Sequence, residues 1–332
     1  MTHLFIFNSK EKSKYHLDYK YVIIFLCLLL FSFWTFEVIN RKLMVGDNYA
    51  MTKLKSFNSQ IDLIEILIIG NSHFHPIESD GFNYKTFNFA VGGSTYYQVY
   101  YFLKDNIEKM SSLKSIIINA DPLNWSSYNN YSNLNPLLWN KFIDYDELSK
   151  IIGYKVLKYR FHFTLLNEVY GRKYFIKNIK HFIKDRLLNN KNISPSKAIK
   201  ESIQLNGNSD ILRRVKKHFF NQNIFENKKL VYFDKLLQLC KNHNISVITV
   251  QMPHRNDYIE QSKDFINMKD INNNVLDNPR YKIGILKNID CYSMFIDHDE
   301  YFLGGDHLNE EGSDTISKYL SNEINSVLSN VR

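Results

Sequence analysis

The amino-acid sequence predicts a three-layer α/β domain on a parallel sheet, with an N-terminal transmembrane helix and a helical insertion. Three observations support this prediction. An uncharged apolar run lies near the amino terminus. Short β-branched runs alternate with helical patterns in both halves of the remaining chain, and a stretch rich in Asn, Lys, Tyr and Phe separates these halves. Strands that alternate with helices in this way form parallel βαβ units.

The apolar run is the first element of the chain. Residues 21–36 carry no charge, and the run extends through Ile39, close to the roughly 20 residues that cross a bilayer. Several lysines precede the run, which favours a cytoplasmic amino terminus, and no small-residue cleavage site follows it. We therefore expect a cytoplasmic tail (1–20), a signal anchor (21–39) and an extracytoplasmic domain (43–332), placed in the periplasm or at the cell surface. A buried core helix is the alternative.

The remaining elements follow from the spacing of apolar residues. After a polar connector at about 43–60, β-branched runs predict five strands, at 61–69, 86–91, 115–119, 245–251 and 289–295. Amphipathic patterns predict helices between and after these strands, at 96–110, 225–242 and 310–328. The stretch from about 125 to 229 has helical periodicity around 146–156 and 172–188 and no strong strand signal. We expect it to be a helical insertion of the kind that often caps an active site.

Charge and cysteine content exclude several classes of function. The chain of 332 residues has a formal net charge of +8, but its basic residues are scattered and form no arginine-rich tract. We therefore expect no nucleic-acid partner, and a basic surface suits an anionic membrane or an acidic glycan instead. No Cys-x-x-Cys motif or His/Cys cluster occurs, so we expect neither a metal nor an organic cofactor. Cys240 and Cys291 lie in apolar contexts and are expected to be buried free thiols.

Two residues at opposite ends of the chain indicate acyl-transfer chemistry. Ser72 follows the first predicted strand, and His307 lies beside Asp306 just before the C-terminal helical pattern. Open α/β sheets bind ligands beyond the carboxyl ends of their strands. A serine hydroxyl needs a base to become a nucleophile, and histidine is the usual one. A plain turn residue is the structural alternative for Ser72, and His73 and His75 are alternatives as base or as substrate contacts.

Three motifs carry a resemblance to a known family. They are Gly70-Asn71-Ser72, Asn88-Phe-Ala-Val-Gly-Gly93 and Asp306-His-Leu-Asn309. With these blocks in this order, the chain resembles the SGNH/GDSL hydrolase superfamily. More closely, it is similar to the membrane-anchored DltD-like and AlgJ-like branch that acts on cell-surface polymers. The resemblance covers roughly residues 61–125 and 245–328, and it implies a flavodoxin-like parallel sheet.

The resemblance also implies roles for individual residues. Ser72 is the implied nucleophile, His307 the implied base, and Gly93 the implied backbone donor to the oxyanion. Each such preorganised donor is worth about 10²–10³ in rate. The family's third block commonly supplies an asparagine side chain as a further donor, but the corresponding strand here ends differently. Three residues near that strand end are the candidates: Asn119, Asp121 and Asn124.

The carboxylate that supports the base also departs from the family pattern. The family commonly places it three residues before the histidine, and Gly304 occupies that position here. We expect the neighbouring Asp306 to take over this role, because a carboxylate fixes the tautomer of the imidazole and stabilises the imidazolium. Asp297, Asp299 and a dyad without any carboxylate remain as alternatives.

The expected function is a membrane-anchored serine acyl esterase or O-acyltransferase, with acetyl as the acyl group. The expected substrate is a surface polysaccharide or a lipid-linked glycan, and an integral-membrane acyltransferase is a further partner. His254 follows the fourth predicted strand at the same sheet edge and is expected to contact substrate. The alternatives are a degenerate SGNH-like binding or assembly partner of such an acyltransferase, and a scaffold whose insertion binds a polymer or a lipid head group.

Overall fold

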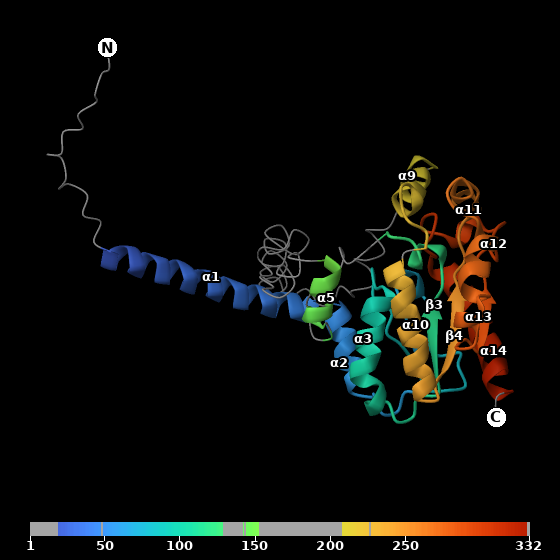
Figure 1. Ribbon diagram of the computed structural model, residues 1–332, viewed down its shortest axis with the longest axis horizontal. Coiled ribbons are helices and arrows are strands. Elements are labelled where there is room, and N and C mark those ends of the chain that lie inside the picture. Colours follow the sequence, from blue (N-terminus) through green and yellow to red (C-terminus); the bar gives the residue numbers. More distant parts are fainter. Residues whose placement is uncertain are drawn as a thin grey trace, which may run out of the picture. The chain divides into compact units, whose positions relative to one another are not determined.

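A computed structural model describes residues 19–47, 49–128, 142, 144–152, 208–225 and 227–330 (Figure 1). The strands are β1 Ile66–Ile69, β2 Thr86–Asn88, β3 Ser115–Asn119, β4 Ser246–Gln251 and β5 Lys287–Asp290. The α-helices are α1 Tyr19–Asp47, α2 Tyr49–Asn58, α3 Tyr96–Asn106, α5 Tyr145–Ile152, α9 Asn208–Phe219, α10 Asn227–Asn242, α11 Asn256–Ser262, α12 Met268–Ile271, α13 Pro279–Lys282 and α14 Glu310–Ser329. Short 3₁₀ or π segments are η1 Ser72–Phe74, η2 Ile107–Lys109, η3 Pro122–Asn124, η6 Asn272–Leu276 and η7 Asp299–Tyr301. The helix predicted at 172–188 lies outside the described residues.

The five strands form one sheet in which every neighbouring pair is parallel. Their order is β2-β1-β3-β4-β5. This order occurs in doubly wound α/β proteins, which bind ligands where the direction of winding reverses. Here that point lies between β1 and β3. The predicted α/β class with a parallel sheet is therefore confirmed.

The register of β1 and β3 brings the residues that follow these strands together. Ile68 of β1 is paired with Ile117 of β3, and Ile69 with Ile118. Because the two strands run in parallel and end almost level, the turn after β1 and the turn after β3 leave the sheet side by side. Ser72 lies in the first of these turns and Asp121 in the second.

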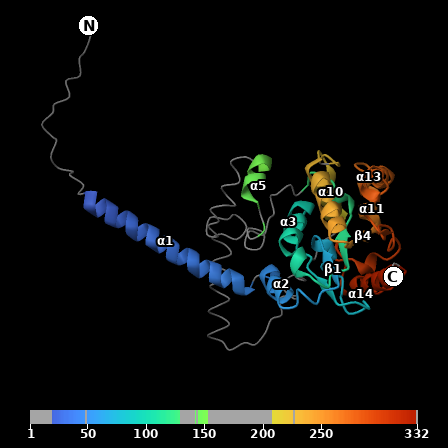
Figure 2. The ribbon, with the colours of Figure 1, turned by 60° about the horizontal axis from the view of Figure 1, so that its bottom comes forward.

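Helices cover both faces of the sheet and so form three layers. Leu67 and Ile69 point to a core shared with α2, α3 and α10, whereas Ile66 and Ile68 point to a core shared with α14. Figures 1 and 2 show α3 and α10 side by side on one face and α14 on the other. All four residues of β1 are buried, as expected for a central strand covered on both faces.

The segment before the sheet differs from the predicted connector. The helix α1 continues to Asp47, and α2 buries Ala50, Leu54 and Phe57 in the core. These residues have the i, i+4, i+7 spacing of a helix face, but lysine and small polar residues between them lower the mean hydropathy. The prediction of a polar connector over 43–60 is therefore wrong for residues 49–58.

The ends of several strands also differ from the prediction, and β2, predicted to run to position 91, ends at Asn88. The predicted first strand began at position 61, but β1 begins at Ile66 because residues 61–63 form a turn. The predicted fifth strand ran to 295, but β5 ends at Asp290, whose side chain accepts a hydrogen bond from the Tyr292 N–H at 3.0 Å. That side-chain contact turns the chain away from the sheet.

The helix α1 contains the apolar segment. Over Tyr19–Ile39 it has the length and hydropathy of a membrane span, and it is the one described helix that does. Its large side chains are exposed, among them Phe25 and Phe31. A single N-terminal helix able to cross a membrane agrees with the predicted anchor, and the orientation of that anchor stays a prediction. Cys240 and Cys291 are buried and unpaired, as predicted.

Candidate active site

The turn after β1 positions Ser72 at the edge of the sheet. Asn71 caps the short helix η1, because its Oδ1 accepts a hydrogen bond from the His73 N–H at 2.9 Å. Gly70 allows β1 to approach β3 closely: a Cβ at this position would lie 3.0 Å from the Cβ of Asn119. These two features bring the serine up against the residues that follow β3.

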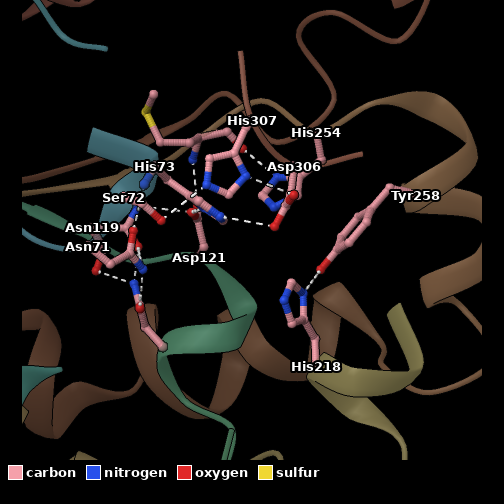
Figure 3. A network of polar contacts seen from close by, with 12 residues as sticks. Asn71, Ser72, His73, Asn119, Asp121, His218, His254, Tyr258, Asp306 and His307 are labelled. Atoms are coloured by element: carbon pink, nitrogen blue, oxygen red, sulfur yellow. Dashed lines mark hydrogen bonds and ion pairs between the residues drawn. The ribbon is translucent and has the colours of Figure 1, made fainter. Parts of the chain in front are cut away.

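Ser72, His307 and Asp306 form a continuous chain of polar contacts (Figure 3). The His307 Nε2 lies 3.1 Å from the Ser72 Oγ, and its Nδ1 lies 2.9 Å from the Asp306 Oδ1. The loop that carries the histidine is held by a hydrogen bond from the Leu303 N–H to the His307 carbonyl at 2.8 Å. Asn309 then caps α14 by accepting from the Gly312 N–H at 3.0 Å.

Asp306 is almost fully buried and lies against three basic groups. Its Oδ1 contacts His307 and forms an ion pair with the Arg214 Nε, and its Oδ2 lies 3.3 Å from the His73 Nε2. Burial opposes ionisation of this carboxyl group. The charges and hydrogen bonds of His307, His73 and Arg214 outweigh burial and hold the pKa of Asp306 well below its usual range. The group is therefore a carboxylate that can accept from His307.

The environment of His307 keeps its imidazole neutral. Burial lowers its pKa, and the positive charges of His73 and Arg214 lower it further, against the opposite effect of Asp306. A neutral imidazole can accept the serine proton at Nε2 provided that Nδ1 carries the hydrogen. Asp306 favours this tautomer by accepting from Nδ1. Arg214 opposes it, because its Nη2 lies 2.9 Å from the same Nδ1 and a guanidinium can only donate.

Ser72 borders two cavities of different size. The smaller, of about 60 Å³, is polar and includes Asn71, Gly93, Asn124 and Arg214 in its wall. The larger has a volume of about 410 Å³, and its wall contains His307 together with these residues: Tyr49, His75, Pro76, Ile77, Met252, Leu303 and Leu308. The base lies on the wall of the larger cavity, and Gly93 on the wall of the smaller one.

The smaller cavity holds the candidate oxyanion donors. Gly93 has φ 75°, a conformation that glycine adopts without strain. Within the described part of the chain, the backbone N–H groups of Ser72 and Gly93 donate no hydrogen bond, so both are available to a ligand. Asn124 also faces this cavity, but its amide nitrogen donates to the Asn119 carbonyl at 2.9 Å and its Oδ1 accepts from Asn71 at 2.8 Å.

The structure brings five of the predicted site residues to one place: Ser72, His307, Asp306, Gly93 and the candidate donor Asn124. The other three are buried and line neither of the two cavities: Asn119, Asp121 and His254. Asn119 donates to the Asp121 Oδ2 at 2.9 Å. The His254 Nδ1 lies 2.8 Å from the Met252 carbonyl, and its ring packs edge-on against His73. The alternative acids Asp297 and Asp299 are exposed, and neither is in contact with His307.

Sequence reasoning missed the contribution of α9. This helix carries Arg214, which contacts both Asp306 and His307, and His218, whose Nδ1 lies 2.7 Å from the Tyr258 hydroxyl. The signal was present in the chain: Ile211, Val215 and Phe219 repeat every four residues, and they put positions 214 and 218 on or beside the same buried face. It was overlooked because the whole stretch was assigned to the insertion.

Two groups of side chains have metal-ligand composition. One is His73, Asp121 and His254, and the other is His73, Asp306 and His307; in each, one nitrogen or oxygen per residue lies within 4.8 Å of the others. Both nitrogens of His73 lie at hydrogen-bond distance from carboxylate oxygens. Asp306 lies at hydrogen-bond distance from His307, whereas His254 only packs its ring edge-on against His73.

Comparisons with known proteins add no identification. No protein-family model matches the chain, and a search of curated proteins finds no match.

Proposed function

We propose that this protein is a membrane-anchored serine esterase or O-acyltransferase of the SGNH/GDSL type, which acts on acetyl esters of a cell-envelope polysaccharide. The contact chain from Ser72 through His307 to Asp306 carries the proposal. The 3.1 Å between the Ser72 Oγ and the His307 Nε2 is the distance of a nucleophile hydrogen-bonded to its base. The 2.9 Å between the His307 Nδ1 and the Asp306 Oδ1 is the distance of a base hydrogen-bonded to its carboxylate. The residues come from opposite ends of the chain, so local sequence does not explain their contact.

The proposed reaction begins with attack by the serine. The Ser72 Oγ bonds to the ester carbonyl carbon while the His307 Nε2 takes the hydroxyl proton. The carbonyl oxygen becomes an oxyanion that accepts from the backbone N–H groups of Ser72 and Gly93. When this intermediate collapses, the bond to the alcohol oxygen breaks and His307 returns its proton to that oxygen. The product is an acyl-serine, with the alcohol released.

The second step repeats the first with a new nucleophile. Water or a sugar hydroxyl attacks the acyl-serine, and His307 takes a proton from the attacking oxygen. Collapse then breaks the bond to Ser72 and returns the proton to its Oγ. Water gives net hydrolysis, and a sugar hydroxyl gives net acyl transfer. The same groups serve both outcomes.

The sizes and wall residues of the two cavities support an ester whose acyl group is acetyl and whose alcohol is a sugar. The alcohol oxygen must reach His307, which lines the larger cavity, whereas the oxyanion must reach Gly93, which lines the smaller one. One water-sized group needs a cavity volume of about 10–15 Å³. The smaller cavity of about 60 Å³ then holds about four to six such groups, enough for an acetyl. The larger, of about 410 Å³, has room for one or more sugar rings.

The membrane anchor supports a substrate at the envelope. The apolar part of α1 ends at Ile39, and nine residues separate it from Tyr49, which lines the larger cavity. A membrane span in the same chain would tether the site to the cell envelope. A surface polysaccharide or a lipid-linked glycan is the sugar alcohol found there, and an integral-membrane acyltransferase is a partner able to supply acyl groups across the membrane.

The proposal is tested with the full chain in detergent micelles. A fluorophosphonate probe should label the wild type and the matched control Ser59→Ala, whose serine is exposed, but neither Ser72→Ala nor His307→Gln. Acetyl-ester hydrolysis should follow the same pattern, and octanoyl esters should react far more slowly than acetyl esters. A folded wild type that neither labels nor hydrolyses esters would overturn the proposal. Labelling that persists in Ser72→Ala would do the same.

One observation favours a second candidate, a catalytically degenerate SGNH-like binding or assembly partner of a membrane acyltransferase. The contact of Arg214 with the His307 Nδ1 favours the tautomer in which Nε2 carries the hydrogen and cannot accept the serine proton. If that tautomer dominates, Ser72 is inert. An unlabelled, folded chain that still binds an acetylated polysaccharide would select this candidate.

A further inference from the structure

His73 lies between two buried carboxylates. Its Nδ1 is 2.5 Å from the Asp121 Oδ2, and its Nε2 is 3.3 Å from the Asp306 Oδ2. The side chains of all three residues are at most 3% exposed. Figure 3 shows His73 beside Ser72, with dashed lines that join its ring to Asp121 and to Asp306.

The hydrogen-bonding capacity of the ring decides its charge. A neutral imidazole has one N–H and one acceptor nitrogen, and an ionised carboxylate can only accept. Two carboxylates at the two ring nitrogens therefore both find a donor only when the ring is an imidazolium. The remaining contacts of Asp121 agree, because its other donors are neutral: the Met252 N–H at 2.6 Å and the Asn119 amide at 2.9 Å. Among the described residues, His73 is the cation paired with Asp121.

We propose that His73 is a permanently protonated positioning residue of the catalytic site. It binds Asp121 with one nitrogen and Asp306 with the other, and so holds the Asp306 carboxylate in place for His307. This inference rests on the proposed serine chemistry. It extends the chain of catalytic contacts by two residues, to Ser72, His307, Asp306, His73 and Asp121.

The charges around His73 balance. Asp121 and Asp306 supply two negative charges, and His73 and Arg214 supply two positive ones. An unpaired charge in a protein interior costs several kcal/mol, so loss of the His73 charge would leave Asp121 without compensation. Burial alone would lower the pKa of His73, but the hydrogen bonds and charges of Asp121 and Asp306 outweigh burial and raise it to about 9.

The imidazolium also tunes the base. The rings of His73 and His307 have centroids 5.0 Å apart, and the positive charge of His73 lowers the pKa of His307. The titratable or charged groups that face these two rings come from five segments of the chain: Asp121 after β3, Arg214 and His218 of α9, His254 after β4, Asp306 before α14, and His75 beside Ser72. Replacing His73 by a neutral residue should therefore raise the pKa of His307.

The charge state of His73 can be measured without any activity. The full chain, labelled with ¹⁵N-histidine and reconstituted in lipid bilayers, is studied by solid-state NMR between pH 6 and 8. His73→Gln identifies the His73 signals by their loss, and His243→Gln, which removes an exposed histidine, is the matched control. Both ring nitrogens of His73 should be protonated throughout this range. A neutral ring at pH 7.5 would overturn the proposal.

The positioning role is measured by the pH dependence of acetyl-ester hydrolysis. In His73→Gln, we expect kcat/KM to fall about 10²-fold, as when a catalytic group is misplaced. The acid limb of the profile, where His307 titrates, should also move about two pH units upward, the size expected for loss of a unit charge about 5 Å away at an effective dielectric constant of about 20. Asp121→Asn should lower kcat/KM in the same direction. His243→Gln should leave rate and profile unchanged.

These results separate the inference from the proposed function. A wild type without Ser72-dependent turnover would remove the serine chemistry, and the NMR signals would still report the charge of His73. A folded His73→Gln variant could have a reduced rate but an unmoved acid limb. That result would show that His73 only supports the fold, and it would contradict the claim that the charge of His73 lowers the pKa of His307. If His73→Gln does not fold, Asp121→Asn decides: a folded Asp121→Asn variant with unchanged kcat/KM would overturn the positioning role.

Discussion

Replacing Asp306 by asparagine tests the identity of the catalytic carboxylate. The Asp306 Oδ1 lies 2.9 Å from the His307 Nδ1 and its Oδ2 lies 3.3 Å from the His73 Nε2, so both oxygens meet donors in the tautomer of His307 that the proposed reaction needs. An asparagine side chain keeps one acceptor and puts an NH₂ group in the other position. If the NH₂ faces His307, it favours the tautomer that cannot accept the serine proton. If it faces His73, two donors oppose one another and the side chain is displaced.

The magnitude follows from the distance between the charges. A carboxylate 2.9 Å from an imidazolium nitrogen interacts by about 6 kcal/mol at an effective dielectric constant of about 20. At about 1.4 kcal/mol per tenfold change, this corresponds to about four decades in rate. His73 and Arg214 already neutralise part of the Asp306 charge. We therefore expect kcat for acetyl-ester hydrolysis to fall about 10³- to 10⁴-fold.

The assay compares purified full-length variants in detergent, with folding checked by circular dichroism. Asp297→Asn is the matched control, because this nearby aspartate is exposed and was the alternative acid. It should change kcat by less than about twofold, as is usual for an exposed position. A loss below tenfold in Asp306→Asn would refute the assignment, and so would an equal loss in the control.

Three further predictions concern charge, pH and packing. Arg214→Gln should move the acid limb of the pH–rate profile upward, because a cation that lowers the pKa of His307 is removed; an unchanged limb would contradict the contact. Burial lowers the pKa of His254 to about 4, so the neutral imidazole contributes its full stabilisation of the folded state above about pH 6.5. This stabilisation is lost as the pH falls towards 4. The free energy of unfolding should therefore decline over that range, and His254→Gln should flatten the decline in denaturant titrations. Phe57→Ala should lower the free energy of unfolding by about 3–5 kcal/mol, because its ring is fully buried; a loss below 1 kcal/mol would mean that α2 is not part of the folded domain.

The parts of the molecule that could be predicted from sequence are those encoded locally. Ser72 and His307 were identified because each follows or precedes a regular element, and parallel strands bring such ends to one edge of a sheet. The role of Gly93 was implied only by the resemblance of Asn88-Phe-Ala-Val-Gly-Gly93 to a block of the SGNH/GDSL superfamily. By contrast, α2 was missed because polar residues between Leu54 and its apolar neighbours mask the helical face.

Contacts between distant segments could not be predicted. Asp121 was expected at the substrate, but it binds His73, 48 positions away, and local sequence contains no sign of that pairing. Arg214 lies 92 positions before Asp306, inside the stretch of about 125–229 that was predicted to be an insertion. The geometry that makes Asp306 suitable as the acid depends on both of these partners.

The balance of charge around His73 has a consequence for how the protein responds to salt. Mobile ions screen exposed charges over about 10 Å at 0.1 M ionic strength, but they do not reach groups sealed within the interior. His73, Asp121 and Asp306 are such groups. Proton transfer at Ser72 should therefore proceed at the same rate in dilute and in concentrated salt. Any salt dependence of turnover would then report the encounter of the basic surface with a charged polymer.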